Sequence, residues 1–145
     1  MGSLILPTSG AVYLDANCFI YSIEKVGPYF SLLQPAWQAA KRGQFLIVTS
    51  ELTWMEVLVR PLKDGNSQVE NSFRSVLTAG DVQMIPATLS LWEDAAKMRV
   101  LGLKTPDALH AATARAAQAA LFVTNDATFR HVPGLNVAVL HEQVP

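Results

Sequence analysis

Four acidic residues are spaced so that folding would bring their carboxylates together: Asp15, Glu56, Asp107 and Asp126. Asp15 directly follows one short apolar run and Asp126 lies just beyond another, whereas Glu56 and Asp107 lie in segments with helical patterns. Acids that converge at one edge of a parallel sheet repel each other unless a cation lies among them. Hard oxygen ligands favour Mg²⁺ or Mn²⁺. Such an ion orients an attacking water and lowers its pKa, so the four residues indicate hydrolysis of a phosphodiester bond.

Each acid also has an ordinary structural explanation. Asp15 is suited to cap a helix or close a turn, and Asp126 to close a turn. Thr53 and Glu56 have the spacing of a capping box. Asp107 lies where the first turn of a helix is expected, and a negative charge there meets the helix dipole favourably. Taken singly, each acid favours its structural role, but four acids beside one sheet edge favour a shared site.

The elements that would position these acids alternate between strands and helices. Short apolar runs rich in β-branched residues predict five strands, at Ala11–Leu14, Phe45–Val48, Val82–Ile85, Leu121–Val123 and Val137–Leu140. Helical patterns cover Cys18–Glu24, Phe30–Arg42, Leu52–Leu62, Gln68–Leu77, Leu89–Leu101 and Pro106–Ala119. Pro35 is expected to kink or split the second helix. Apolar strands that alternate with helices predict an α/β fold with a parallel sheet covered on both faces.

Length and composition predict a single domain over residues 1–145. Half of the residues are hydrophobic, 16% are charged and the net charge is -1, which excludes intrinsic disorder and indiscriminate coating of nucleic acid. Cys18 is the only cysteine, so an internal disulfide and a cysteine cluster for zinc or iron-sulfur are excluded. The apolar start at Leu4–Leu6 stops at Pro7, short of a secretory or membrane segment. We therefore expect a cytoplasmic protein without a membrane partner.

Four segments, in order, resemble the four motifs of the PIN domain family: Val12–Asn17, Thr49–Leu58, Thr105–Ala114 and Val123–Asp126. Each motif is weak alone, but the ordered set is specific, and the resemblance spans about Val12 to Leu140. It implies a central parallel five-stranded sheet flanked by helices on both faces. A lone PIN domain of this length is similar to the toxin of a VapBC-type toxin-antitoxin pair.

The resemblance also implies a set of site residues. Its catalytic acids match Asp15, Glu56, Asp107 and Asp126, of which Asp15, Asp107 and Asp126 match the metal ligands. Residues that match substrate-contacting or supporting positions are Asn17, Thr124, Asn125 and His110. His110 lies three residues after Asp107 on the same helical face, where it could contact substrate, carry a proton or simply pack. Glu51 competes with Glu56 for the second acid, and the motif favours Glu56.

The function expected from these residues is that of an Mg²⁺- or Mn²⁺-dependent endoribonuclease. Hydrolysis would leave a 3′-hydroxyl and a 5′-phosphate, and the family points to single-stranded or looped regions of tRNA or rRNA. The resemblance implies that an antitoxin protein is a partner. Broad apolar faces on the helices at Phe30–Ala40 and Leu52–Leu62 predict a homodimer. Some of the basic residues are expected to touch phosphate: Lys104, Arg115 and Arg130, which flank the acids in sequence, and two other small groups at Lys41, Arg42, Arg60 and Lys63.

Two other functions remain open on the sequence. A phosphatase of the haloacid-dehalogenase type also places Asp at a strand exit, but its motif needs a second Asp where this chain has Asn17. It also needs a lysine to neutralise the acyl-phosphate, and none follows Lys104. The other alternative is a PIN-like binding module without catalysis, against which the presence of all four acids argues.

Overall fold

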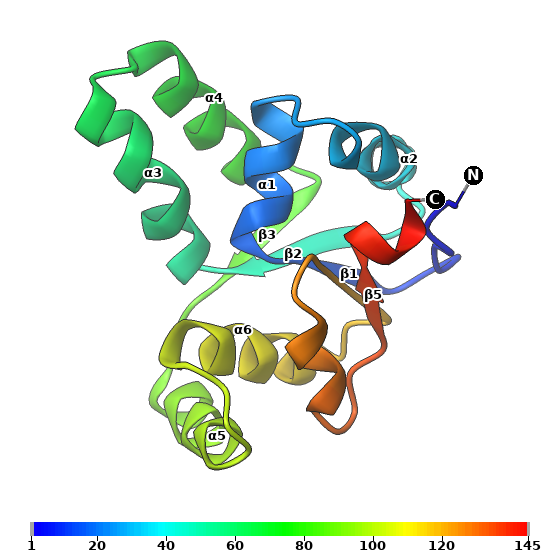
Figure 1. Ribbon diagram of the computed structural model, residues 1–145, viewed down its shortest axis with the longest axis vertical. Helices are drawn as coiled ribbons and strands as arrows, with labels where there is room; N and C mark the ends of the chain where they lie inside the picture. Colours follow the sequence, from blue (N-terminus) through cyan, green and yellow to red (C-terminus); the bar gives the residue numbers. More distant parts are fainter. Residues whose placement is uncertain (1, 145) are drawn as a thin grey trace.

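A parallel sheet lies at the centre of the fold (Figure 1). The structure is a computed structural model that describes residues 2–144, and over these residues it forms one five-stranded sheet of order β3-β2-β1-β4-β5. The strands are β1 (Ala11–Leu14), β2 (Leu46–Ser50), β3 (Val82–Ile85), β4 (Leu121–Thr124) and β5 (Val137–Val139). Every adjacent pair is parallel, which confirms the predicted α/β class.

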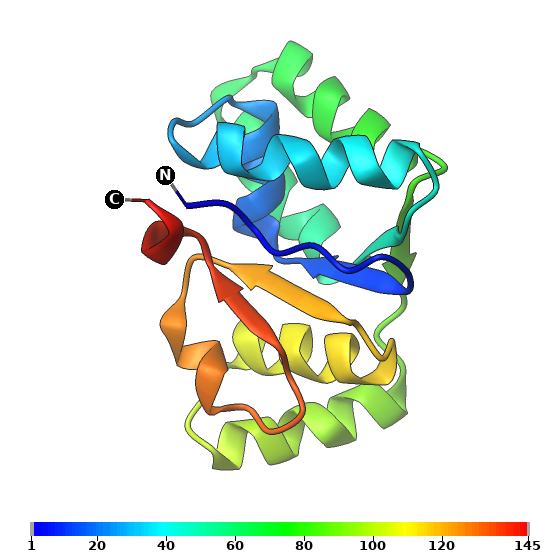
Figure 2. The same cartoon turned by 90° about the vertical axis from the view of Figure 1, so that its right-hand side faces the viewer.

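Helices cover both faces of this sheet. The α-helices are α1 (Ala16–Ile23), α2 (Tyr29–Lys41), α3 (Leu52–Asp64), α4 (Ser67–Leu77), α5 (Leu89–Val100) and α6 (Thr105–Ala116). Short 3-10 helices follow β4 and β5 at η1 (Ala127–His131) and η2 (Leu140–Gln143). The first four α-helices lie on one face and α5 and α6 on the other (Figures 1 and 2). Within the described range, no helix is both long and apolar enough to cross a bilayer.

Strand β1 divides its side chains between the two helical layers. Val12 and Leu14 pack into the core beneath α1–α4, and Tyr13 between them packs into the core formed with α5 and α6. The Tyr13 ring is fully buried and stacks on Phe122, with ring centroids 5.0 Å apart and planes at 4°. Burial of a phenol requires a hydrogen-bond partner for its hydroxyl, so β1 brings a polar group into the α5–α6 layer.

Pro35 does not split the helix, which was one of the two effects expected of it. Helix α2 runs unbroken from Tyr29 to Lys41 through Pro35, as Figure 2 also shows. A proline removes one hydrogen bond of the helix, and burial of apolar side chains on both sides of it can offset that loss. Leu33 and Trp37 on either side of Pro35 belong to the core. Tertiary packing therefore holds the two halves in one helix.

The sheet order places a reversal between β1 and β4. From β1 the chain adds β2 and β3 on one side, and β4 and β5 on the other. In open α/β sheets, ligands bind beyond the carboxyl ends of the strands at such a reversal. Asp15 directly follows β1, and Thr124 ends β4 in the neighbouring register position. The fold thus directs attention to the same edge that the acidic residues indicate.

Candidate carboxylate site

Asp15 lies at the junction of β1, β4 and α1. Its Oδ2 accepts a hydrogen bond from Thr124 Oγ1 at 2.6 Å, and its Oδ1 accepts one from the Cys18 backbone N–H at 3.2 Å. The second bond makes Asp15 the N-cap of α1. The carboxylate is buried, and burial raises its pKa above the usual range, although the bonds from Thr124 and Cys18 oppose the rise. The structural role expected for Asp15 and its place in the acidic cluster thus coexist.

Asp107 and Asp126 stand on the α5–α6 side of the same edge. Asp107 lies in the first turn of α6 and is half-buried. Burial raises its pKa, and the nearby charges of Asp126, Asp15 and Glu56 raise it further. Asp126 is exposed, and its Oδ1 caps η1 by accepting bonds from the backbone N–H and hydroxyl of Thr128. The raised pKa of Asp107 therefore reflects its burial first and its proximity to three other carboxylates second.

Glu56 reaches this edge from α3. Its side chain is 28% exposed, and Oε1 accepts a hydrogen bond from His110 Nε2 at 2.6 Å. The expected capping box does not form, because α3 begins after Glu51 and the Thr53 hydroxyl bonds the Thr49 hydroxyl instead. Glu51 itself is exposed and makes no side-chain cap bond. Of the two glutamates, the structure brings Glu56 to the other acids.

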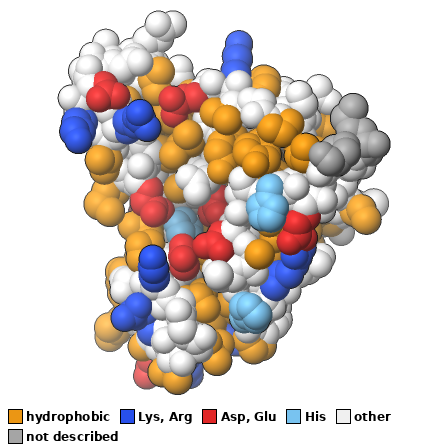
Figure 3. Space-filling model, viewed as in Figure 1, with side chains coloured by type: hydrophobic (Ala, Val, Ile, Leu, Met, Phe, Trp, Pro, Cys, Tyr) orange, Lys and Arg blue, Asp and Glu red, His pale blue; other side chains and the backbone are white. Residues whose placement is uncertain are grey.

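Two adjoining cavities share Asp107 in their walls. One, of about 190 Å³, is lined by Asp15, Ala16, Asn17, Ile20, Glu56, Asp107 and His110. The other, of about 320 Å³, includes Lys104, Asp107, Asp126, Thr128 and His131 in its lining. In Figure 3, acidic side chains gather around a histidine in a hollow at mid-height of the molecule. The four acids thus surround one continuous region of surface.

The remaining predicted residues divide into two groups. Thr124 and His110 contact acids directly, and Asn17 lines the smaller cavity. Asn125 does not face the acids: its side chain donates to Tyr21 Oη at 3.3 Å and accepts from the His141 N–H at 2.8 Å, which fastens the C-terminal segment. Of the three basic residues that flank the acids in sequence, Lys104 lines the larger cavity, Arg130 pairs with Glu142 and Arg115 contacts Met98.

Tyr13 contacts the site, although its sequence pattern indicated only a buried strand. Its hydroxyl lies 2.6 Å from His110 Nδ1 and accepts the Ser50 backbone N–H at 3.1 Å. Burial raises the pKa of this phenol well above its ordinary value. A tyrosine in an otherwise aliphatic buried strand needs a polar partner, and that requirement is the signal by which Tyr13 could have been found.

The donor set suits a hard divalent cation. All four acids offer oxygen ligands, and their repulsion is relieved by positive charge. Across residues 2–144, no three His, Cys, Asp or Glu side chains are grouped closely enough to hold a metal by themselves. Mg²⁺ is commonly held by one or two carboxylates together with waters and substrate phosphate, so it does not need a group of three. The residues present therefore fit such an ion.

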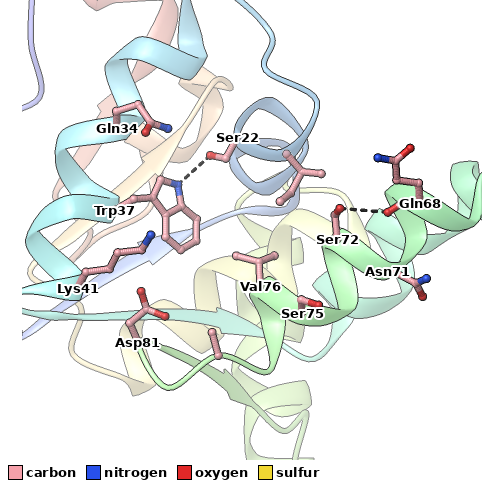
Figure 4. A pocket seen from close by; sticks show the side chains of 12 residues that line it. Ser22, Gln34, Trp37, Lys41, Gln68, Asn71, Ser72, Ser75, Val76 and Asp81 are labelled. Carbon is pink, nitrogen blue, oxygen red and sulfur yellow. Dashed lines mark hydrogen bonds between the residues drawn. The ribbon is translucent and has the colours of Figure 1, made fainter.

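A separate cavity of about 690 Å³ lies between α1, α2 and α4 (Figure 4). Trp37 forms one wall, where its indole N–H donates to Ser22 Oγ at 2.9 Å, and Val76 and Ser75 on α4 face it from the other side. None of the four acids lines this cavity. It is a mixed apolar and polar groove, distinct from the carboxylate site.

Comparisons with known proteins agree with this architecture. A family model described as "PIN domain" matches residues 12–135. Among solved structures, the chain is similar to VapBC2 from Rickettsia felis bound to a promoter DNA fragment, with a TM-score of 0.69 and 20% identity over 89% of this chain and 98% of that one. No curated protein matches the sequence.

Two further solved structures share the fold. One is a toxin-antitoxin complex from Klebsiella pneumoniae, with a TM-score of 0.61 and 28% identity over 88% of this chain and 96% of that one. The other is VapC20 of Mycobacterium tuberculosis, described as a toxin that cleaves the sarcin-ricin loop, with a TM-score of 0.68 and 14% identity over 82% of this chain and 92% of that one.

The raised pKa values of Asp15 and Asp107 predict that the metal-free protein gains stability in mild acid. The folded state binds these protons more tightly than the unfolded chain does. Stability therefore increases as the pH falls from neutral toward the unfolded aspartate pKa of about 3.9, and decreases as the pH rises through the folded values. Thermal melts in EDTA across this range measure the effect.

The variant Asp15→Asn tests the source of this pH dependence. Asparagine is also a good N-cap and can hydrogen-bond Thr124, so the melting temperature at pH 7 in EDTA should stay level or rise and its pH dependence should weaken. Asp64→Asn, which changes an exposed aspartate, is the matched control and should leave the pH dependence unchanged. A large fall in the melting temperature of Asp15→Asn would show that the cap and hydrogen bonds made by the carboxylate outweigh the cost of burying its charge.

Proposed function

Because the chain belongs to the PIN domain family, we propose that it is a divalent-metal-dependent endoribonuclease and the toxin of a VapBC-type toxin-antitoxin pair. The observation that carries the proposal is the gathering of four carboxylates at the β1–β4 edge, where their charges raise the pKa of Asp107 in addition to its burial. Carboxylates that repel each other are stabilised by a bound cation, and a metal-dependent nuclease uses that arrangement. Solved toxin-antitoxin complexes with the same fold support the assignment.

Asp15, Asp107 and Asp126 are the residues that would hold Mg²⁺ or Mn²⁺, one or two of them directly and the rest through water, with substrate phosphate completing the coordination. When bound, such an ion lowers the pKa of water and neutralises charge that develops on the phosphodiester. Glu56 stands in the wall of the same cavity as Asp15 and Asp107, where its carboxylate accepts a proton from the attacking water. Asp15 is held rigidly by Thr124 and Cys18, so the site is organised before substrate arrives.

The shape of the site favours single-stranded or looped RNA. Its two cavities adjoin at Asp107, and Lys104 lies in the wall of the larger one, where a phosphate can pair with it. A backbone must splay away from a duplex to enter such a recess, and loops of structured RNA allow this. Loops of tRNA or rRNA are therefore the substrates we expect, in keeping with the sarcin-ricin loop named for the toxin VapC20.

Replacement of Asp15 or Asp126 by asparagine tests the catalytic assignment. Each change removes a charge while it nearly preserves shape, so metal-dependent RNA cleavage should fall more than about 100-fold in a protein that remains folded. Cleavage is measured on structured RNA with Mg²⁺ or Mn²⁺, with Asp64→Asn as a variant that keeps full activity. A fully active Asp15→Asn protein would show that the proposed catalytic site is wrong.

The proposed antitoxin supplies a segment that docks on the toxin. The groove between α1, α2 and α4 offers the Trp37 and Val76 side chains to apolar residues of such a segment. A basic side chain of the same segment pairs with the carboxylates and takes the place of the metal. Such a segment is disordered when free and orders on the toxin surface.

Inhibition by purified antitoxin should weaken as Mg²⁺ or Mn²⁺ is raised, because the ion and the basic residue compete for the same charge. Ser75→Arg, which fills the groove, should lower antitoxin affinity at least about tenfold and leave RNA cleavage intact. Ser90→Arg, at an exposed serine on α5, is the matched control. If inhibition does not change with metal concentration, the antitoxin acts away from the carboxylates, by blocking RNA access or disrupting a dimer.

A second copy of the chain is the other proposed partner. Met55, Val59 and Leu62 are large exposed apolar residues that share one face of α3. Light scattering should show a dimer at micromolar concentration, and Val59→Lys should shift it toward monomer because a charge then faces the interface. Val100→Lys, at an exposed valine on α5, should leave the dimer intact. A wild-type monomer across micromolar concentrations would exclude this partner.

A further inference from the structure

A chain of three hydrogen bonds runs from the sheet to Glu56. The Ser50 backbone N–H of β2 donates to Tyr13 Oη at 3.1 Å, Tyr13 Oη lies 2.6 Å from His110 Nδ1, and His110 Nε2 lies 2.6 Å from Glu56 Oε1. Its members come from β2, β1, α6 and α3. Helices α3 and α6 lie on opposite faces of the sheet (Figure 1), so the bond between His110 and Glu56 connects the two helical layers.

The donors in this chain fix its direction. The Ser50 N–H can only donate, so it occupies a lone pair of the Tyr13 hydroxyl. At the other end of the chain the Glu56 carboxylate accepts, so Nε2 of His110 carries the proton of that bond. An imidazole with its single proton on Nε2 has a lone pair on Nδ1, which accepts the hydrogen bond from the Tyr13 hydroxyl.

Rigidity decreases along the chain from Tyr13 to Glu56. Tyr13 is fully buried and stacked on Phe122, and the His110 ring, 3% exposed, meets the Tyr13 ring edge-on with centroids 5.8 Å apart. Glu56 is partly exposed on the surface of α3 and has three side-chain torsions of its own. The fixed pair therefore restrains the mobile carboxylate rather than the reverse.

We propose that Tyr13 and His110 are positioning residues that hold Glu56 in the geometry needed to take a proton from water. The bond to Nε2 engages one carboxylate oxygen, and the second oxygen is the one that receives the proton. This inference rests on the proposed nuclease function. It assigns His110 to Glu56 rather than to the substrate, and it gives Tyr13 a role beyond packing.

Cleavage kinetics of three variants test the role of this hydrogen-bond chain in the full-length protein. Tyr13→Phe keeps the ring and removes the hydroxyl, so kcat should fall about tenfold while KM stays unchanged. His110→Asn can reach Tyr13 but not Glu56, and should lose about 10- to 100-fold in kcat. His110→Gln places an amide N–H near the former Nε2 and should recover most of that loss. A loss expressed in KM, or equal losses for Asn and Gln, would overturn the proposal.

Tyr13→Phe in a Glu56→Gln background separates an effect on the position of Glu56 from general damage to the protein. If Tyr13 acts through Glu56, Tyr13→Phe should lower kcat no further in that background. An equal fall in both backgrounds would show a merely structural role. Tyr13→Phe also deprives the Ser50 N–H of its acceptor, so all assays run well below the measured melting temperature of each variant.

A spectroscopic measurement tests the hydrogen-bond chain even if the protein cleaves no RNA. The ¹⁵N shifts of the His110 imidazole report which ring nitrogen carries the proton. Wild type should show the Nε2–H form with an Nδ1 shift typical of a hydrogen-bond acceptor, and Tyr13→Phe should keep the Nε2–H form but move the Nδ1 shift to that of an unbonded ring nitrogen. A proton on Nδ1 of His110 in the wild-type protein would overturn the proposed hydrogen-bond chain. Absence of cleavage together with the expected tautomer would instead count against the nuclease function alone.

Discussion

The hydrogen bond from Thr124 to Asp15 is the contact around which the site is organised. It joins the ends of β1 and β4 at the reversal in strand order, and Asp15 passes the constraint on to α1 through the Cys18 N–H. Burial of an ionised carboxylate costs several kcal/mol unless other groups compensate. Two hydrogen bonds to a charge, at roughly 1.5–3 kcal/mol each, recover much of that cost. The raised pKa shows that burial still prevails.

The alternation of side chains along β1 explains why one strand serves two parts of the site. Leu14 packs under the first four helices and Tyr13 under α5 and α6, and the strand then ends at Asp15. Helix α6 has the complementary arrangement, because Asp107 and His110 lie one turn apart and approach the acids and Tyr13 respectively. A shift of one residue in either element would separate the carboxylates from the hydrogen-bond chain.

The fold could be predicted largely because burial leaves a strong pattern in sequence. Strands that are apolar throughout predicted a parallel sheet, and Asp15 and Asp126 beyond two of them predicted the edge at which carboxylates meet. Contacts between residues that are far apart in the sequence could not be predicted. The pattern of β1 revealed the burial of Tyr13 but not its partner, and the spacing of Thr53 and Glu56 matched a capping box although Thr53 bonds Thr49 instead. Local spacing does not identify tertiary partners.

The structural and chemical roles of the acids are therefore complementary. Asp15 caps α1, Asp107 opens α6 and Asp126 caps η1, so positive helix ends face carboxylates at α1 and α6. A helix dipole contributes only about 0.3–1 kcal/mol to such a charge, less than the several kcal/mol that burial costs. Helix ends thus orient the acids without neutralising them. Burial raises the pKa of Asp15, and burial together with repulsion from neighbouring carboxylates raises that of Asp107, so a bound divalent cation is the charge best suited to offset both effects.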